Sequence, residues 1–208
     1  PYRIVGGFRF YERAEIRDAL AYLRLVQSPA DDLAFERIVN VPKRGLGDKA
    51  LARIHQFARI ERAPLFHAAA RITETDELTP QARRQLANFI AQMRNWQGKA
   101  NELSHPELTQ LILDESGYTA MLQADRSAEA AGRLENLSEL VRAMEDYESL
   151  EAFLEHVSLV MDRDNDDQAE TVTIMTIHAA KGLEFDHVFL AGWEDGVFPS
   201  QRSMDEGG

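Results

Sequence analysis

Residues that favour β-structure occur only near the two ends of this 208-residue chain, with a long helical stretch between them. Residues 2–5 alternate in polarity before two glycines, while residues 171–176 and 187–191 are rich in β-branched and apolar side chains. From about residue 31 to residue 161, apolar residues recur at helical spacing. The two ends can share one parallel sheet only if they meet in space. We therefore expect a mainly α chain, in which a helical domain is inserted into a small α/β domain.

The helical stretch divides into separate amphipathic segments. The first carries apolar residues at helical spacing from Ile16 to Val26 and is expected to end before Pro29, because proline disfavours a helical conformation in the preceding residue. Pro42 breaks the second segment, and Asp48 places an anion in the first turn of the third. The helices after the first are expected at residues 33–39, 48–57, 65–71, 80–96, 106–116, 133–147 and 150–161.

Composition places the chain among ordinary globular proteins, with 44% hydrophobic and 28% charged residues. No apolar run is long enough for a membrane span and no signal-peptide pattern opens the chain, so no membrane partner is expected. The absence of cysteine excludes disulfides, zinc–thiolate sites and a cysteine nucleophile, and it fits a cytoplasmic protein. The first residue is not Met and the last two are glycines after a polar loop, so both ends are interpreted as cut points in a longer protein.

Charge is distributed unevenly along the chain. The net charge of −12 argues by itself against a nucleic-acid partner. Residues 37–62, however, contain seven Lys and Arg against two Asp and Glu, whereas residues 101–170 contain four Arg against eighteen Asp and Glu. Such asymmetry allows a local basic patch on an acidic protein. For the basic stretch taken alone, a merely solvated helix surface is an equally good explanation.

The glycine-rich turn at residues 41–47 lies within this basic stretch, between two expected helices. Glycines two residues apart allow a tight turn that exposes backbone N–H groups at the start of the next helix, where phosphate oxygens bind. Such contacts hold a phosphate backbone without reading bases, as in helix-hairpin-helix duplex binders. A plain turn between helices is the alternative. The residues expected to face duplex DNA are Lys43, Arg44, Gly45, Leu46, Gly47 and Lys49.

A second cluster of polar residues follows the expected strand at residues 171–176. Thr176, His178, Lys181 and Glu184 would lie at the carboxyl edge of a sheet, where open α/β sheets bind ligands. Taken singly, the histidine is better explained as a packed or surface residue, and the lysine and glutamate as a pair on one helical turn. No phosphate-binding Walker A sequence occurs in the chain.

A third segment, residues 192–200, follows the expected strand at 187–191. Its acidic pair, Glu194 and Asp195, has no third ligand at a suitable spacing, so no metal site is expected and a surface loop is favoured. Trp193 and Phe198 have the chemistry to stack on bases, but core packing is the better explanation for each.

Together, and in this order, five segments resemble the UvrD/PcrA/Rep-type superfamily 1 DNA helicases. Residues 2–24 resemble motif IVa of that family, residues 41–47 the Gly-x-Gly hairpin of its 2B subdomain, residues 132–140 a further 2B helix, residues 173–185 motif V, and residues 192–200 the loop after motif V. The resemblance spans almost the whole chain, and the agreement in order makes a chance match very improbable.

The resemblance implies a helical 2B-like domain inserted into a partial RecA-like parallel sheet. Residues 1–28 and the truncated residues 166–208 would form parts of the RecA-like 2A domain, and residues 29–165 would form the 2B-like insertion. It also implies nucleotide binding by Glu184 and Gly182, and single-stranded DNA binding by His178, Thr176, Lys181 and Ser200. For Arg133, Glu135 and Asn136 we expect a structural network inside the insertion.

For activity, the resemblance implies an ATP-dependent 3′→5′ helicase that translocates on single-stranded DNA and unwinds duplex at a junction. The full-length protein would use ATP and Mg²⁺, with the phosphate-binding loop and the Mg²⁺-binding motif in a preceding RecA-like domain and motif VI after Gly208. This piece alone is expected to be inactive and to bind neither ligand. The alternatives are a non-enzymatic module that binds duplex DNA or docks a protein, and a subunit of a RecB-like helicase–nuclease.

Overall fold

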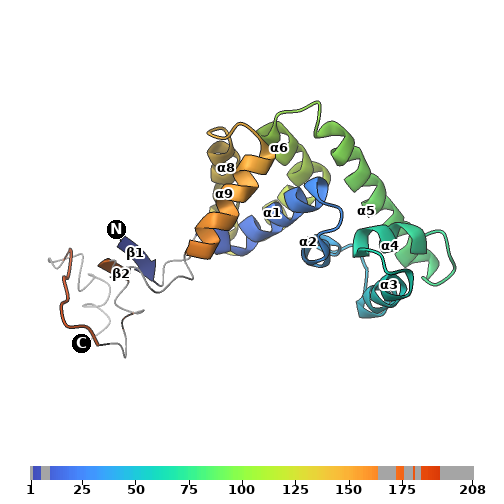
Figure 1. Cartoon of the computed structure of the whole chain (residues 1–208), viewed down its shortest axis with the longest axis horizontal. Coiled ribbons are helices and arrows are strands. Elements are labelled where there is room, and N and C mark those ends of the chain that lie inside the picture. Colours follow the sequence, from blue (N-terminus) through green and yellow to red (C-terminus); the bar gives the residue numbers. More distant parts are fainter. Residues whose placement is uncertain (1, 6–9, 164–171, 176–179, 181–183, 193–208) are drawn as a thin grey trace. The chain divides into compact units, whose positions relative to one another are not determined.

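The computed structural model describes residues 2–5, 10–163, 172–175, 180 and 184–192 (Figure 1). The chain divides into two compact units, one made of Pro1–Gly7 with Glu170–Gly208 and the other of Phe8–Ala169. The second unit is helical, which confirms the expectation of a mainly α chain. Among the described residues, no helix combines the length and the apolar character needed to cross a membrane.

The helical unit begins with a short 3-10 helix, η1 (Phe10–Glu12), and continues through a series of α-helices. Their bounds are α1 (Ala14–Gln27), α2 (Asp32–Ile38), α3 (Asp48–Glu61), α4 (Leu65–Ile72), α5 (Pro80–Lys99), α6 (His105–Glu115), α7 (Tyr118–Ala124), α8 (Ala130–Met144) and α9 (Leu150–Arg163). The helices predicted from apolar spacing are therefore confirmed, with boundaries shifted by a few residues. The prediction missed η1 and α7.

Helix α7 was missed because it is short and follows Gly117 directly. Gly117 has φ +80°, a left-handed conformation that favours glycine, and the sequence indicated only that it ends α6. Seven residues are too few to display a helical period of apolar residues. Tertiary packing holds α7 in place instead, since Tyr118 and Leu122 are buried.

Helix α1 is the centre of the helical unit. It contacts α2, α5, α6, α8 and α9 (Figure 1). Residues such as Ile16, Tyr22 and Leu25 are fully buried. A helix that is covered on most sides acts as the core against which the other helices pack. The helix ends as predicted before Pro29, where the Ser28 N–H donates to the Arg24 carbonyl at 2.7 Å. By its contacts α1 belongs with the helices that follow it, while the predicted domain boundaries at residues 28/29 and 165/166 stay predictions.

The other unit contains a pair of parallel strands, β1 (Tyr2–Val5) and β2 (Val172–Met175). Their register runs from Tyr2 opposite Val172 to Val5 opposite Met175. Strands from the two ends of the chain thus lie side by side, as a sheet divided along the sequence requires.

The strand expected at residues 187–191 was wrong. Residues 187–190 have no regular secondary structure, and Ala191 lies in a turn. A β-strand needs a hydrogen-bonded neighbour, and none of the described strands pairs with this segment. Its apolar side chains are exposed, with Phe189 at 93%, so an apolar run alone did not establish a strand.

Candidate nucleic-acid interface

The glycine-rich turn connects the end of α2 to the start of α3. Gly45 has φ +74°, a conformation that strains any residue with a Cβ atom. Gly47 has φ −76° and serves as the N-cap of α3, so its backbone does not require glycine. A Cβ atom at Gly47 would meet nothing within 4 Å. The first glycine therefore shapes the turn, and the second leaves the beginning of α3 without a side-chain cap.

Asn40 organises the turn through its side chain. Its Oδ1 accepts hydrogen bonds from the N–H groups of Arg44 (2.8 Å) and Leu46 (3.3 Å), and its Nδ2 donates to the Leu46 carbonyl at 2.8 Å. The Leu46 side chain is fully buried and anchors the turn in the core. Sequence reasoning overlooked Asn40, although asparagine commonly bonds to nearby backbone in turns. Leu46, predicted to face DNA, has its side chain inside the protein.

Arg44 points into the protein. Its Nη2 donates to the Tyr22 hydroxyl at 2.7 Å, and the guanidinium carbon lies 4.8 Å from the centroid of the Phe89 ring. Its Nη1 donates to the carbonyl oxygens of Ile38 (2.8 Å), Val41 (3.1 Å), Val39 (3.3 Å) and Pro42 (3.3 Å). These include carbonyls that the end of α2 leaves without helical partners. We predicted that Arg44 faces a phosphate as a counter-charge. In the structure its guanidinium is instead bonded inside the protein.

Tyr22 connects this arrangement to the central helix α1. Besides accepting from Arg44, its hydroxyl donates to the Val41 carbonyl at 2.5 Å. Burial raises the pKa of the Tyr22 phenol, and the Arg44 guanidinium opposes this effect. The phenol is therefore protonated at neutral pH and can donate one hydrogen bond while it accepts another.

Lys43 and Lys49 are exposed on the turn and on the first turn of α3. Within the part of the chain that the structure describes, neither ammonium group has an ion-pair partner. The first two N–H groups of α3, those of Asp48 and Lys49, have no partner inside the helix and none from a Gly47 side chain, whereas the Ala50 N–H donates to the Gly47 carbonyl at 2.8 Å. Asp48 stands in the same turn and partly offsets the positive helix end. An anion that binds here would have two lysines and uncapped N–H groups as donors.

The exposed side of α3 extends this basic surface. Only Ile54 and Ala58 of this helix are buried, and Arg53, Gln56 and Arg59 are exposed along it. A hollow of about 560 Å³ lies beside the turn. Small residues line much of it, including Gly45, Gly47, Ala50 and Ala82, together with the charged residues Lys49, Arg53 and Glu77, of which Arg53 and Glu77 form an ion pair at 3.8 Å. Small side chains and positive charge suit a close approach by a sugar–phosphate backbone.

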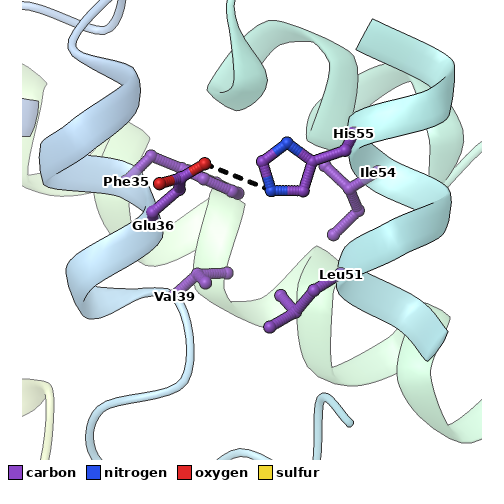
Figure 2. A pocket seen from close by; sticks show the side chains of 6 residues that line it. All are labelled: Phe35, Glu36, Val39, Leu51, Ile54 and His55. Atoms are coloured by element: carbon purple, nitrogen blue, oxygen red, sulfur yellow. Dashed lines mark ion pairs between the residues drawn. The ribbon is translucent and has the colours of Figure 1, made fainter. Parts of the chain in front are cut away.

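A shallow apolar pocket of about 280 Å³ lies between α2 and α3 and is lined by residues of both (Figure 2). Phe35 and Val39 from the α2 side face Leu51 and Ile54 of α3 across it. At its rim, His55 Nε2 lies 3.2 Å from the carboxylate of Glu36, which forms an ion pair when the imidazole is protonated. These contacts join the two helices on either side of the turn.

A separate polar network joins α1 to α8. Glu15 is buried, and its carboxylate accepts a hydrogen bond of 2.6 Å from the Asn136 side chain, which in turn accepts from Arg13. Asn136 therefore belongs to a structural network, but this network reaches Arg13 and Glu15 in residues 1–28, whereas we expected it to lie inside residues 29–165. Arg133 contacts Glu129 at 2.9 Å, and Glu135 is exposed.

Of the residues predicted to bind nucleotide or single-stranded DNA, the structure describes only Glu184, which is exposed. Thr176, His178, Lys181, Gly182 and Ser200 lie outside the described residues. Among the residues that are described, no group of three or more His, Asp and Glu side chains could hold a metal ion.

These features define a helical module with a glycine-rich turn that carries two exposed lysines, and a small parallel β unit. The chain belongs to the UvrD-like helicase C-terminal domain family, whose family model matches residues 1–208. It is 47% identical to DNA helicase II of Rickettsia typhi over 210 residues, which cover 100% of this chain and 32% of the relative. It is 44% identical to ATP-dependent DNA helicase PcrA of Bacillus subtilis, with 99% and 29% covered, and 40% identical to DNA helicase II of Escherichia coli, with 100% and 30% covered. The chain thus spans less than a third of the length of these curated relatives.

Proposed function

We propose that this chain is part of an ATP-dependent 3′→5′ DNA helicase and that its helical unit binds duplex DNA through the turn before α3. The observation that carries the proposal is the exposure of Lys43 and Lys49 beside the uncapped start of α3. Membership of the UvrD-like family and the helicase names of the relatives support it. Phosphate contacts of this kind fix position without reading bases, so we expect negligible sequence preference.

The proposed architecture assigns the helical unit to a 2B-like insertion and the strand unit to part of a RecA-like 2A domain. The parallel pairing of β1 with β2 supports it, because one sheet joins the two ends of the chain. Thr176, His178, Lys181 and Ser200 are proposed to contact single-stranded DNA, and Gly182 to lie at the nucleotide.

In the same proposal, Glu184 binds the ribose of ATP. Its carboxylate is exposed, and a carboxylate accepts hydrogen bonds from ribose hydroxyls. The phosphate-binding loop and the Mg²⁺ ligands would come from other parts of the full-length protein, since phosphoryl transfer needs these groups together. ATP binding would close the cleft between the two RecA-like domains, and hydrolysis would reopen it.

Salt-dependent binding to a duplex oligonucleotide tests the DNA surface. Each phosphate contact contributes about 0.9 to the slope of log affinity against log salt, so Lys43→Ala/Lys49→Ala should lower that slope by about 1.8. Between 50 and 200 mM salt, wild-type affinity should then fall about 12-fold more than that of the variant. Arg94→Ala/Arg126→Ala, which removes two exposed charges elsewhere, is the matched control. Equal slopes for the lysine variant and the wild type would remove the turn from the interface.

Reconstitution tests the helicase assignment. The chain alone should show no ATPase activity, because it lacks a phosphate-binding loop. Mixing it with a separately produced N-terminal half and a motif VI segment should restore ATPase activity that single-stranded DNA stimulates. Duplex binding by the chain without any such restoration would favour a non-enzymatic DNA-binding module.

A further inference from the structure

We propose that Tyr22 and Arg44 form a latch that holds the turn in its DNA-binding conformation from behind, without touching DNA. The proposal rests on the proposed duplex-binding function and adds two positioning residues to it. Neither residue type suggests this role in the sequence, where Arg44 stands among basic residues and Tyr22 lies in a core helix.

The latch connects the turn to three helices. Through Arg44, the turn is bonded to the hydroxyl of Tyr22 on α1, to carbonyls at the end of α2, and to the ring face of Phe89 on α5. The Tyr22 hydroxyl completes the latch by donating to the Val41 carbonyl. The Tyr22 side chain has 0% exposure, so a ligand on the surface cannot reach it.

The turn depends on such side-chain bonds because it has little other support. It belongs to no helix or sheet, and Leu46 is its fully buried anchor. Asn40 holds the part of the turn that leads into α3, whereas Arg44 and Tyr22 bind carbonyls on the side of α2. These are the carbonyls of Ile38, Val39, Val41 and Pro42. Without the latch, the limb after α2 would have to be ordered during binding, which lowers affinity.

A direct contact between Arg44 and a phosphate is the competing explanation. In that case Arg44→Lys, which keeps the charge, should bind almost normally, and Tyr22→Phe should have no effect. If Arg44 and Tyr22 act as the latch, both Arg44→Lys and Tyr22→Phe should weaken duplex binding. A lysine ammonium cannot reproduce the planar fork of donors, and phenylalanine lacks the hydroxyl that Arg44 and Val41 share.

The experiment measures duplex affinity against salt for the wild type, Tyr22→Phe, Arg44→Lys and the control Tyr118→Phe. Tyr118 is also buried, and its hydroxyl donates to Asp18 at 2.7 Å. All measurements are made at a temperature at which circular dichroism shows each variant fully folded. Tyr22→Phe and Arg44→Lys should each bind about fivefold more weakly, the effect of about one hydrogen bond, with the salt slope unchanged. Tyr118→Phe should bind as the wild type does.

The combined variant Tyr22→Phe/Arg44→Lys should bind no more weakly than the weaker single variant, because both changes open the same latch. Wild-type affinity in Tyr22→Phe, or an equal loss in Tyr118→Phe, would overturn the latch and leave the proposed function intact. A wild-type protein that does not bind duplex would overturn both.

Discussion

The first N–H groups of α6 are capped by side chains, whereas those of α3 are not. Helix α6 has a capping box, in which the Ser104 side chain accepts from the backbone N–H of Glu107, and the Glu107 carboxylate accepts from the Ser104 N–H at 3.0 Å. The same carboxylate accepts from the Ser104 hydroxyl at 2.6 Å. Helix α3 follows its N-cap Gly47, which has no side chain, and two exposed lysines, Lys43 and Lys49, lie beside this helix end. A helix that caps itself has its donors occupied, whereas an uncapped one keeps them for a ligand. The capping box stabilises the start of α6, whereas the start of α3 keeps donors available for the phosphate binding that we propose.

Among the changes at these two helix ends, Gly45→Ala should change the free energy of unfolding the most. A residue with a Cβ atom at φ +74° is strained, which should lower the free energy of unfolding by about 1–2 kcal/mol and displace the turn from its DNA-binding conformation. Gly132→Ala in α8 is the control, because Gly132 lies in a helix with no positive φ and with open space at its Cβ position. That change should instead raise the free energy of unfolding by about 0.5–1 kcal/mol. Urea denaturation measures both, and destabilisation by both changes would contradict the argument.

Ser104→Ala should have the next largest effect. Loss of the capping hydroxyl should lower the free energy of unfolding by about 1 kcal/mol, again measured by urea denaturation. Duplex affinity of the folded protein should not change, because this cap lies in the acidic part of the chain. A parallel loss of duplex binding would show that the two helix ends are not independent.

The sequence predicted the positions of the helices along the chain better than the directions of the side chains in the turn. Regular apolar spacing predicted α3, of which only Ile54 and Ala58 are buried, because burial on one side of a helix imposes a period on the sequence. The composition of the turn likewise identified a basic glycine-rich connection. Composition does not fix the direction of a side chain, so Lys43 and Arg44 looked alike although one is exposed and the other points inward. The inward direction depends on Tyr22 and Phe89, which are distant in sequence.

Gly47→Ser would make the start of α3 resemble that of α6. A serine hydroxyl at this N-cap should accept from one of the free N–H groups and stabilise the helix by a few tenths of a kcal/mol. The same bond occupies a donor that we propose for phosphate, so duplex affinity should fall about twofold to threefold. Titration with a fluorescent duplex checks this, with Gly132→Ser in α8 as the control. Tighter binding by Gly47→Ser would show that the free N–H groups do not face DNA.

The smallest predicted effect is a pH dependence confined to α6. Hydrogen bonds from the Ser104 side chain and backbone hold the pKa of Glu107 below its usual value near 4.5. A carboxyl whose pKa is lower in the folded protein stabilises it above the unfolded pKa, and this contribution disappears as the pH falls through the folded pKa. Between pH 6 and pH 3, the melting temperature of Glu107→Gln should therefore fall less steeply than that of the wild type. The start of α3 has no such carboxyl–serine pair, so Gly47→Ser should follow the wild-type pH profile. Equal slopes for Glu107→Gln and the wild type would mean that the carboxylate does not close α6 in solution, and the contrast between the two helix ends would then rest on α3 alone.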